Sequence, residues 1–325
     1  MNTRVKTALD RMAAQQFPSV EAMRDAPPIE RARWWRDRPA DVTASPTTRV
    51  PLRSPVRRRL LLAGGLAAIV GAAVLVLPSL PGGVAYAATP PLLAYEPVAG
   101  KTANEVLAEL AGRARGQLGP VGAGRFHYVH TRGWYLHTAT DDTDRLLRSG
   151  IATVDREQWK AVDGSGRLKV SDGTPEAPNA TFPPGGLTKG FLADDATVAD
   201  VQARLNQDTP SGIANAVSEL WARQVVPPVL HSKLLTILAS QPDLTLLGTT
   251  TDRAGRRGVA IGVERRQGIA ERRVLVFAPD TGALLDSELI ALEASELPVK
   301  VPATIAYTVW LGTGYTATTE QRPAG

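Results

Sequence analysis

The sequence predicts an α+β protein with three parts: an N-terminal cytoplasmic tail, one transmembrane helix, and an extracytoplasmic domain in which a curved antiparallel sheet packs against helices. Two observations predict this class. An apolar run without charge spans residues 60–80. Beyond it, the signals follow the order helix, hairpins, helices and strand meander. The 325-residue chain has no cysteine, which excludes disulfides, thiol catalysis and Cys-ligated zinc.

The apolar run 60–80 has the length of a membrane span, because a helix of this length extends about 30 Å, the thickness of the hydrocarbon core. Residues 1–59 contain 13 Arg/Lys and 6 Asp/Glu, whereas the rest of the chain has a net charge of −2. Basic flanks of a span stay in the cytoplasm. We therefore expect a single-pass protein of the cell membrane, with a cytoplasmic N-terminus and an extracytoplasmic C-terminal domain that contacts the lipid bilayer through 60–80.

A cleaved signal sequence is the alternative interpretation of this run. Ala85-Tyr86-Ala87 before Ala88 resembles a signal-peptidase site. However, 59 residues precede the run, which is longer than an ordinary n-region, and the run itself is longer than an ordinary h-region. These lengths favour a retained anchor, and the sequence leaves cleavage after Ala87 open.

Composition shifts divide the chain into five segments: a basic cytoplasmic segment (1–59), the transmembrane helix (60–80), a stalk or linker (81–100), the α+β domain (101–315) and a tail (316–325). The first segment is polar and rich in proline, which indicates partly helical or disordered chain. Trp34 and Trp35 are its candidate docking residues for a cytoplasmic partner. Its basic residues are scattered among prolines and acids, so no nucleic-acid partner is expected.

Helix signals in the large domain are capping boxes and proline starts. Thr102 and Glu105 have capping-box spacing, as do Thr197 and Asp200, and Pro227-Pro228 opens a later helix. The predicted helices cover 102–117, 197–206, 213–225 and 229–241.

Strand signals are alternating or apolar runs separated by turn residues. We expect a break at Gly133, a long loop over 172–190, and turns at 252–255 and 279–282. The turn 252–257 contains Arg253, Arg256 and Arg257, which we interpret as a solvated hairpin end. The predicted strands cover 126–138, 151–162, 167–170, 244–251, 258–265, 272–277, 284–292 and 304–311.

The candidate catalytic and metal motifs are weak. Asp280-Thr281-Gly282 resembles the D-T-G of aspartic proteases, but that chemistry needs two carboxylates, and a type I turn is favoured. His127, His130 and His137 cluster on one predicted strand, where His130 faces away from the other two. No nucleophile elbow, P-loop or dinucleotide motif occurs. We expect no enzyme activity, no catalytic residue, no metal site and no cofactor.

Aromatic residues gather on two adjacent predicted strands. One face of these strands is a candidate groove for a lipid or peptide ligand, and the alternative is the core of the sheet. The candidate groove residues are Phe126, Tyr128, Trp134, Tyr135 and Trp159.

Three segments together carry a family resemblance: DREQWKAVDGSGR (155–167), PPVLHSKLLTILASQPDLTLLGTTTDRAGRRGVAI (227–261) and FAPDTGALLDSELI (277–290). With them the chain resembles an uncharacterised, anti-sigma-like family of actinobacterial single-pass membrane proteins. The resemblance implies a sigma factor as partner and an outer domain similar to lipoprotein carriers and periplasmic sigma regulators. It implies no catalytic or binding residues. The chain lacks the zinc motif of typical anti-sigma factors.

Two functional hypotheses follow. The first is a membrane-anchored extracytoplasmic sensor, regulator or ligand-binding protein, anti-sigma-like, with a sigma factor or another protein as cytoplasmic partner. The alternative is an anchored module that binds lipid or lipoprotein, as carriers do. An envelope hydrolase ranks third, because no residue constellation supports it.

Overall fold

The structure is a computed structural model that describes residues 88–140, 146–173, 178–187, 191–265, 270–293 and 299–323. Side chains of 138–140 and 146–149 are not described. The basic segment 1–59 and the apolar run 60–80, together with the candidate docking residues Trp34 and Trp35, lie outside the described residues.

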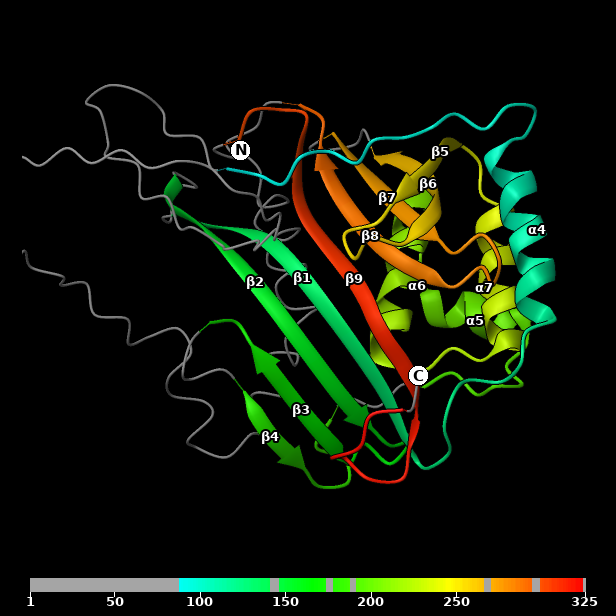
Figure 1. Ribbon diagram of the computed structural model, residues 1–325, viewed down its shortest axis with the longest axis vertical. Helices are drawn as coiled ribbons and strands as arrows, with labels where there is room; N and C mark the ends of the chain where they lie inside the picture. The colour runs from blue at the N-terminus through cyan, green and yellow to red at the C-terminus, as the bar shows by residue number, and fades with distance from the viewer. Residues whose placement is uncertain are drawn as a thin grey trace, which may run out of the picture. The chain divides into compact units, whose positions relative to one another are not determined.

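Within the described residues, one antiparallel sheet of nine strands forms the frame of the domain, in the order β4-β3-β2-β1-β9-β8-β7-β6-β5 (Figure 1). Most neighbours in the sheet are also neighbours in sequence, which is the arrangement of a meander. The pairing of β1 with β9 joins the N-terminal strands β1–β4 to the C-terminal strands β5–β9 in a single sheet. The strands are β1 (Phe126–Thr140), β2 (Leu146–Lys160), β3 (Gly166–Ser171), β4 (Asn179–Phe182), β5 (Leu244–Thr251), β6 (Arg257–Arg265), β7 (Glu271–Phe277), β8 (Leu284–Ala291) and β9 (Ala303–Thr316).

Four helices are described, and their starts follow the predicted signals. Thr102 and Thr197 each form a complete capping box, and Pro228 is the first residue of the last helix. The predicted helix starts are therefore confirmed to within three residues. The helices are α4 (Ala103–Arg115), α5 (Val198–Leu205), α6 (Pro210–Arg223) and α7 (Pro228–Ala239).

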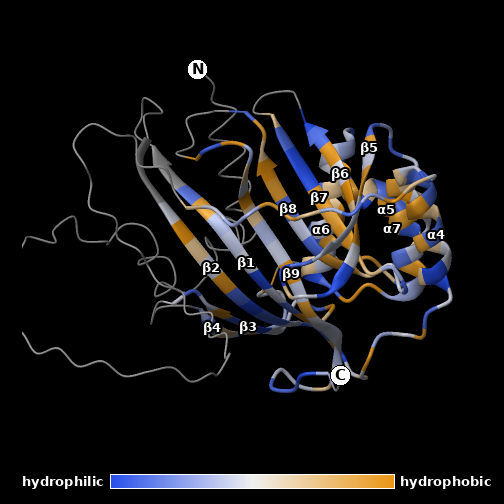
Figure 2. Cartoon of the chain, turned by 45° about the horizontal axis from the view of Figure 1, so that its top comes forward, coloured by the Kyte–Doolittle hydropathy of each residue, from blue (hydrophilic) through white to orange (hydrophobic). Residues whose placement is uncertain are grey.

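The helices cover one face of the sheet, which we call the helix face. Its core joins all four helices to apolar strand residues such as Val129, Leu275 and Phe277. Figure 2 shows hydrophobic residues concentrated in the helices and in the strands beside them. Burial of this apolar surface is the main stabilising term for the fold.

The opposite face of the sheet, which we call the outer face, is partly covered by the N-terminal segment 88–97. Leu93 and Tyr95 of this segment pack against a second cluster that includes Val274 and Val276. Glu96 forms two backbone hydrogen bonds with Thr249 of β5, each 2.8 Å long. The segment, predicted as stalk, therefore lies along the sheet and pairs with its edge strand.

The predicted transmembrane helix is corrected by the structure. Within the described residues, the longest helix is α6 with 14 residues, and none is long and apolar enough to cross a bilayer. A span needs about 20 apolar residues. The single-pass fold class and the location in the cell membrane therefore lack structural support, and the run 60–80 on which they rested is outside the described residues.

The strand predictions hold for the meander and are less exact elsewhere. β5 has the predicted bounds, and β6, β7 and β8 differ by one residue at one end. The predicted break at Gly133 is wrong, because β1 runs through it. Strand β4 lies inside the region predicted as a long loop, and its pairing with β3 extends the sheet.

Candidate functional site

The five predicted groove residues divide between the two faces of the sheet. β1 and β2 pair in regular register from His127 to Ala139, so the side chains alternate strictly over this stretch. Val129 belongs to the helix-face core, which places Tyr135 on the same face. The remaining four residues lie on the outer face: Phe126, Tyr128, Trp134 and Trp159.

These aromatic residues contact different neighbours. The Tyr128 ring packs against Trp159 with centroids 5.1 Å apart, while Trp134 stacks on Tyr307 at 6.4 Å. On the other face, the Tyr135 hydroxyl is 2.9 Å from Thr308 Oγ1. The structure thus does not bring the five residues together in one groove.

The strand histidines follow the predicted alternation. His130 lies 2.8 Å from Asp155 on the outer face. On the helix face, His127 Nδ1 accepts the Val225 N–H at 3.2 Å, and burial lowers the pKa of His127 to about 4. Among the residues that the structure describes, no group of three or more His, Cys, Asp or Glu could hold a metal ion.

The turn between β5 and β6 differs from its prediction as a solvated end. Arg253 Nε donates to Glu288 at 2.6 Å, and Arg256 donates to Asp252, whose side chain is fully buried. Only Arg257 is largely exposed, at 74%. Two of the three arginines thus neutralise buried carboxylates. The sequence of the turn does not predict the pair with Glu288, because Glu288 lies on another strand, β8.

Four basic side chains converge on the helix face, and we call them the basic cluster: Arg156, Lys160, Arg204 and Arg223. Arg156 and Lys160 lie on β2, on the same face as Gln158, which pairs with Val129. Arg204 and Arg223 are in the last turns of α5 and α6, where a positive charge interacts favourably with the helix dipole. Gln158 Nε2 donates to the Arg223 carbonyl at 3.2 Å and ties β2 to the end of α6.

Two members of the basic cluster, Arg156 and Lys160, are desolvated, whereas Arg204 is exposed and Arg223 is partly exposed. Lys160 is 4% exposed, and its ammonium lies 4.4 Å from the centre of the Phe191 ring. Burial lowers the pKa of Lys160 to about 8, and repulsion by Arg223, Arg156 and Arg204 adds to this effect. Burial, with repulsion by Arg223, lowers the pKa of Arg156 to about 10.

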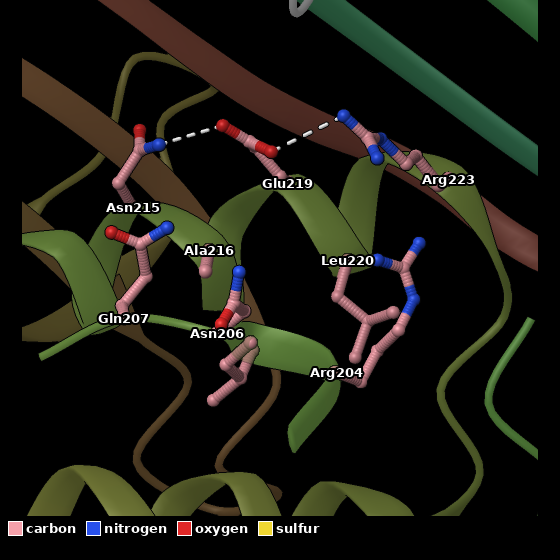
Figure 3. Close-up of a pocket in the computed structure, with 9 residues that line it drawn as sticks. Arg204, Asn206, Gln207, Asn215, Ala216, Glu219, Leu220 and Arg223 are labelled. Carbon is pink, nitrogen blue, oxygen red and sulfur yellow. Dashed lines mark hydrogen bonds and ion pairs between the residues drawn. The ribbon is translucent and has the colours of Figure 1, made fainter. Parts of the chain in front are cut away.

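A pocket of about 230 Å³ lies beside the cluster, between α5 and α6 (Figure 3). Arg204 and Arg223 line it together with Asn206, Gln207 and Asn215. Its one acidic lining residue, Glu219, accepts from Asn215 at 2.6 Å and from Arg223 at 3.2 Å.

The chemistry of this site is that of an anion receptor. Guanidinium groups and carboxamide N–H groups donate hydrogen bonds, and carboxylates and phosphates accept them best. A bound anion would also relieve the repulsion among the four cations.

Sequence reasoning did not find this site. The available signal was the segment 155–158, four consecutive polar residues in a strand, because a strand that covers a core has apolar residues at alternate positions. That signal places charge on both faces of β2, but it does not predict that α5 and α6 bring two more arginines to one of them.

Comparisons with known proteins identify no family for this chain and find only distant structural similarity. No family model and no curated protein matches it, so the resemblance to an actinobacterial family is not confirmed. Among solved structures, it is similar to the Pseudomonas aeruginosa MucA/MucB complex (18% identity, 68% of this chain, 60% of that chain). MucB with MucA(peri) has 19% identity over 69% and 60%, and MucB alone has 18% over 69% and 62%. Each TM-score is 0.27, and the match spans about three fifths of those chains.

Proposed function

We propose that this protein is a non-catalytic regulatory binding protein, and that its basic cluster holds an acidic segment of a protein partner. The observation that carries the proposal is the convergence of four cations from β2, α5 and α6, two of them with lowered pKa values. Desolvated charges that repel one another cost folding free energy, and such a cost is common where a binding site needs them.

The lining of the pocket favours a polar partner over a lipid tail. Charged and carboxamide side chains make up most of it, and Leu205, Ala216 and Leu220 are its apolar members. Pockets for lipid tails are mainly apolar. The hypothesis of a carrier-like module for lipid or lipoprotein therefore receives little support from this site.

A sigma factor as the partner is the narrower form of this proposal. Trp34 and Trp35, the residues predicted to dock it, lie outside the described residues, so this form stays a prediction. A pull-down with residues 1–59 tests it separately.

Isothermal titration calorimetry of the 325-residue chain with a hexaglutamate peptide tests the proposal. We expect saturable binding that weakens as salt is added, because exposed charge pairs are screened. Arg223→Gln should weaken binding at least tenfold, since a hydrogen bond to a charged group contributes roughly 1.5–3 kcal/mol. Lys160→Met removes a buried charge near Arg204 and Arg223 and should also weaken binding, through the lost attraction for the anion.

The matched control is Arg257→Gln, which removes an exposed arginine at the start of β6, outside the basic cluster. Its affinity should stay within about twofold of the original chain, within the scatter expected of exposed charges. Equal affinities in all three variants, or no binding at all by the original chain, would reject the proposal.

A further inference from the structure

The chain crosses back over the outer face of the sheet after β9. Residues 317–323 lie against β2, where Trp159 Nε1 donates to the Gln321 carbonyl at 2.5 Å. Pro323 packs on Gly314. A Cβ atom added at position 314 would lie only 2.7 Å from the Pro323 ring, so this close approach needs glycine. Three consecutive residues, Gln321, Arg322 and Pro323, thus hold this segment on the sheet.

Glu157 is the receptor for Arg322. The Arg322 guanidinium donates to both carboxylate oxygens of Glu157, at 2.6 and 2.8 Å, which is the bidentate geometry of the strongest ion pairs. The Tyr128 hydroxyl donates to the same carboxylate at 2.9 Å. These bonds, above all that of Arg322, lower the pKa of Glu157 to about 2, so the carboxylate stays charged at all physiological pH values.

Burial of the two partners is unequal. The Glu157 side chain is 5% exposed, whereas the Arg322 side chain is 61% exposed. The carboxylate belongs to a strand inside the sheet and is fixed by Tyr128, while the arginine comes from a short segment with few anchors. A fixed, buried acceptor with a peripheral donor is the arrangement of a preorganised site and its ligand.

Space remains beside this pair. A hollow of about 420 Å³ is lined by Glu157, Trp159, Arg167, Lys169, Thr319, Glu320 and Arg322. Lys169 Nζ lies 3.5 Å from Glu157, a longer contact than those of Arg322. The segment 317–323 therefore covers Glu157 and Trp159 without filling the hollow. Two of the predicted groove residues contribute to this site: Trp159 bonds the Gln321 carbonyl, and Tyr128 bonds the Glu157 carboxylate.

We infer that this outer-face surface is a docking site for an arginine-bearing extended segment of a protein partner, and that Gln321-Arg322-Pro323 occupies it as an internal ligand. The bound tripeptide defines the chemistry of the partner: an arginine for Glu157, preceded by a residue whose carbonyl accepts from Trp159. This site is separate from the basic cluster, because Glu157 and Lys160 lie on opposite faces of β2.

The test uses a fluorescein-labelled peptide with the sequence of residues 319–324, Thr-Glu-Gln-Arg-Pro-Ala. In the original chain the tethered segment competes at an effective concentration in the millimolar range, so the free peptide should bind poorly. In Arg322→Ala, we expect fluorescence anisotropy to report at least tenfold tighter binding. Replacing the peptide arginine by alanine, or adding Glu157→Gln to the chain, should abolish it.

Arg132→Ala is the matched control, since Arg132 is an exposed arginine on the same face that pairs with Asp155. It should bind the peptide no better than the original chain. A folded Arg322→Ala chain that fails to bind, or that binds the alanine peptide equally well, would overturn the inference and make the segment a purely structural element. If Arg322→Ala does not fold, the same anisotropy assay uses Arg322→Lys, which keeps the charge but loses the bidentate pair with Glu157. Tighter peptide binding than in the unsubstituted chain is then expected, and equal binding would overturn the inference.

Discussion

At the scale of single residues, β8 places two buried carboxyl groups on the outer face, and these two groups differ in their hydrogen bonds to Arg253. Glu288 is fully buried and accepts from Arg253 at 2.6 Å. Asp286 is fully buried too, but its Oδ1 has no hydrogen-bond partner among the described residues, and only the Arg253 N–H approaches its other oxygen, at 3.3 Å. Burial, with repulsion by Glu288, raises the pKa of Asp286 to about 8.

This raised pKa makes stability depend on pH with a definite sign. In the unfolded chain the carboxyl of Asp286 titrates near 3.8, so the folded state holds the proton more tightly. Its stabilising contribution is complete below about pH 4 and is lost as the pH rises through 8. Asp286→Asn keeps the shape and removes the titration. Chemical denaturation should find it more stable than the unsubstituted chain at pH 9, by several kcal/mol, and this difference should shrink steadily as the pH is lowered toward 4.

Asp208→Asn is the control for Asp286→Asn, because Asp208 is exposed. We expect no change of its pH profile relative to the original chain. If Asp286→Asn followed the same profile as the original chain, a neutral Asp286 in the folded protein would be refuted.

At the scale of elements, the N-terminal segment 88–97 is attached through one tight contact. Gly248 has a φ of +125°, and a Cβ atom there would lie 2.2 Å from the Glu96 carbonyl oxygen. Thr250 and Arg253 add side-chain bonds to the carbonyls of Ala94 and Pro91. A glycine in β5 thus permits the pairing that covers this edge of the sheet.

Gly248→Ala should release this segment. We expect a loss of about 1–3 kcal/mol of stability from backbone strain and the lost pairing, and faster protease cleavage within 88–97. Gly255→Ala is the control, since Gly255 also has a positive φ, +82°, but has nothing within 4 Å of an added Cβ. Equal cleavage of the two variants would mean that the close contact with Glu96 is unimportant.

Elements could be predicted from the sequence where local chemistry determines them. The capping boxes at Thr102 and Thr197 involve residues three apart, and the backbone bonds of the turn at Asp280-Thr281-Gly282 join residues four or five apart. β4 was missed because its four residues lie in a region rich in proline and glycine and form a strand only by pairing with β3. The groove residues were assigned to one face although alternation alone puts Tyr135 opposite Trp134.

At the scale of the whole molecule, β2 carries two different surfaces. Arg156 and Lys160 belong to the basic cluster on the helix face, and Glu157 and Trp159 hold residues 321–322 on the outer face. The sequence DREQWK (155–160) contains this alternation. The partners could not be predicted, because Arg204, Arg223 and Arg322 come from distant parts of the chain and are placed only by the tertiary fold.

Whether the basic cluster holds an anion can be read from the pKa of the Lys160 ammonium, measured by NMR with ¹³C-labelled lysine. Lys160→Met assigns the signal. We expect a value of about 8 for the chain alone, and a clear rise when hexaglutamate is added, because a nearby anion stabilises the charged form. A pKa that is normal without the peptide, or unchanged by saturating peptide, would contradict the assignment of the basic cluster as an anion site.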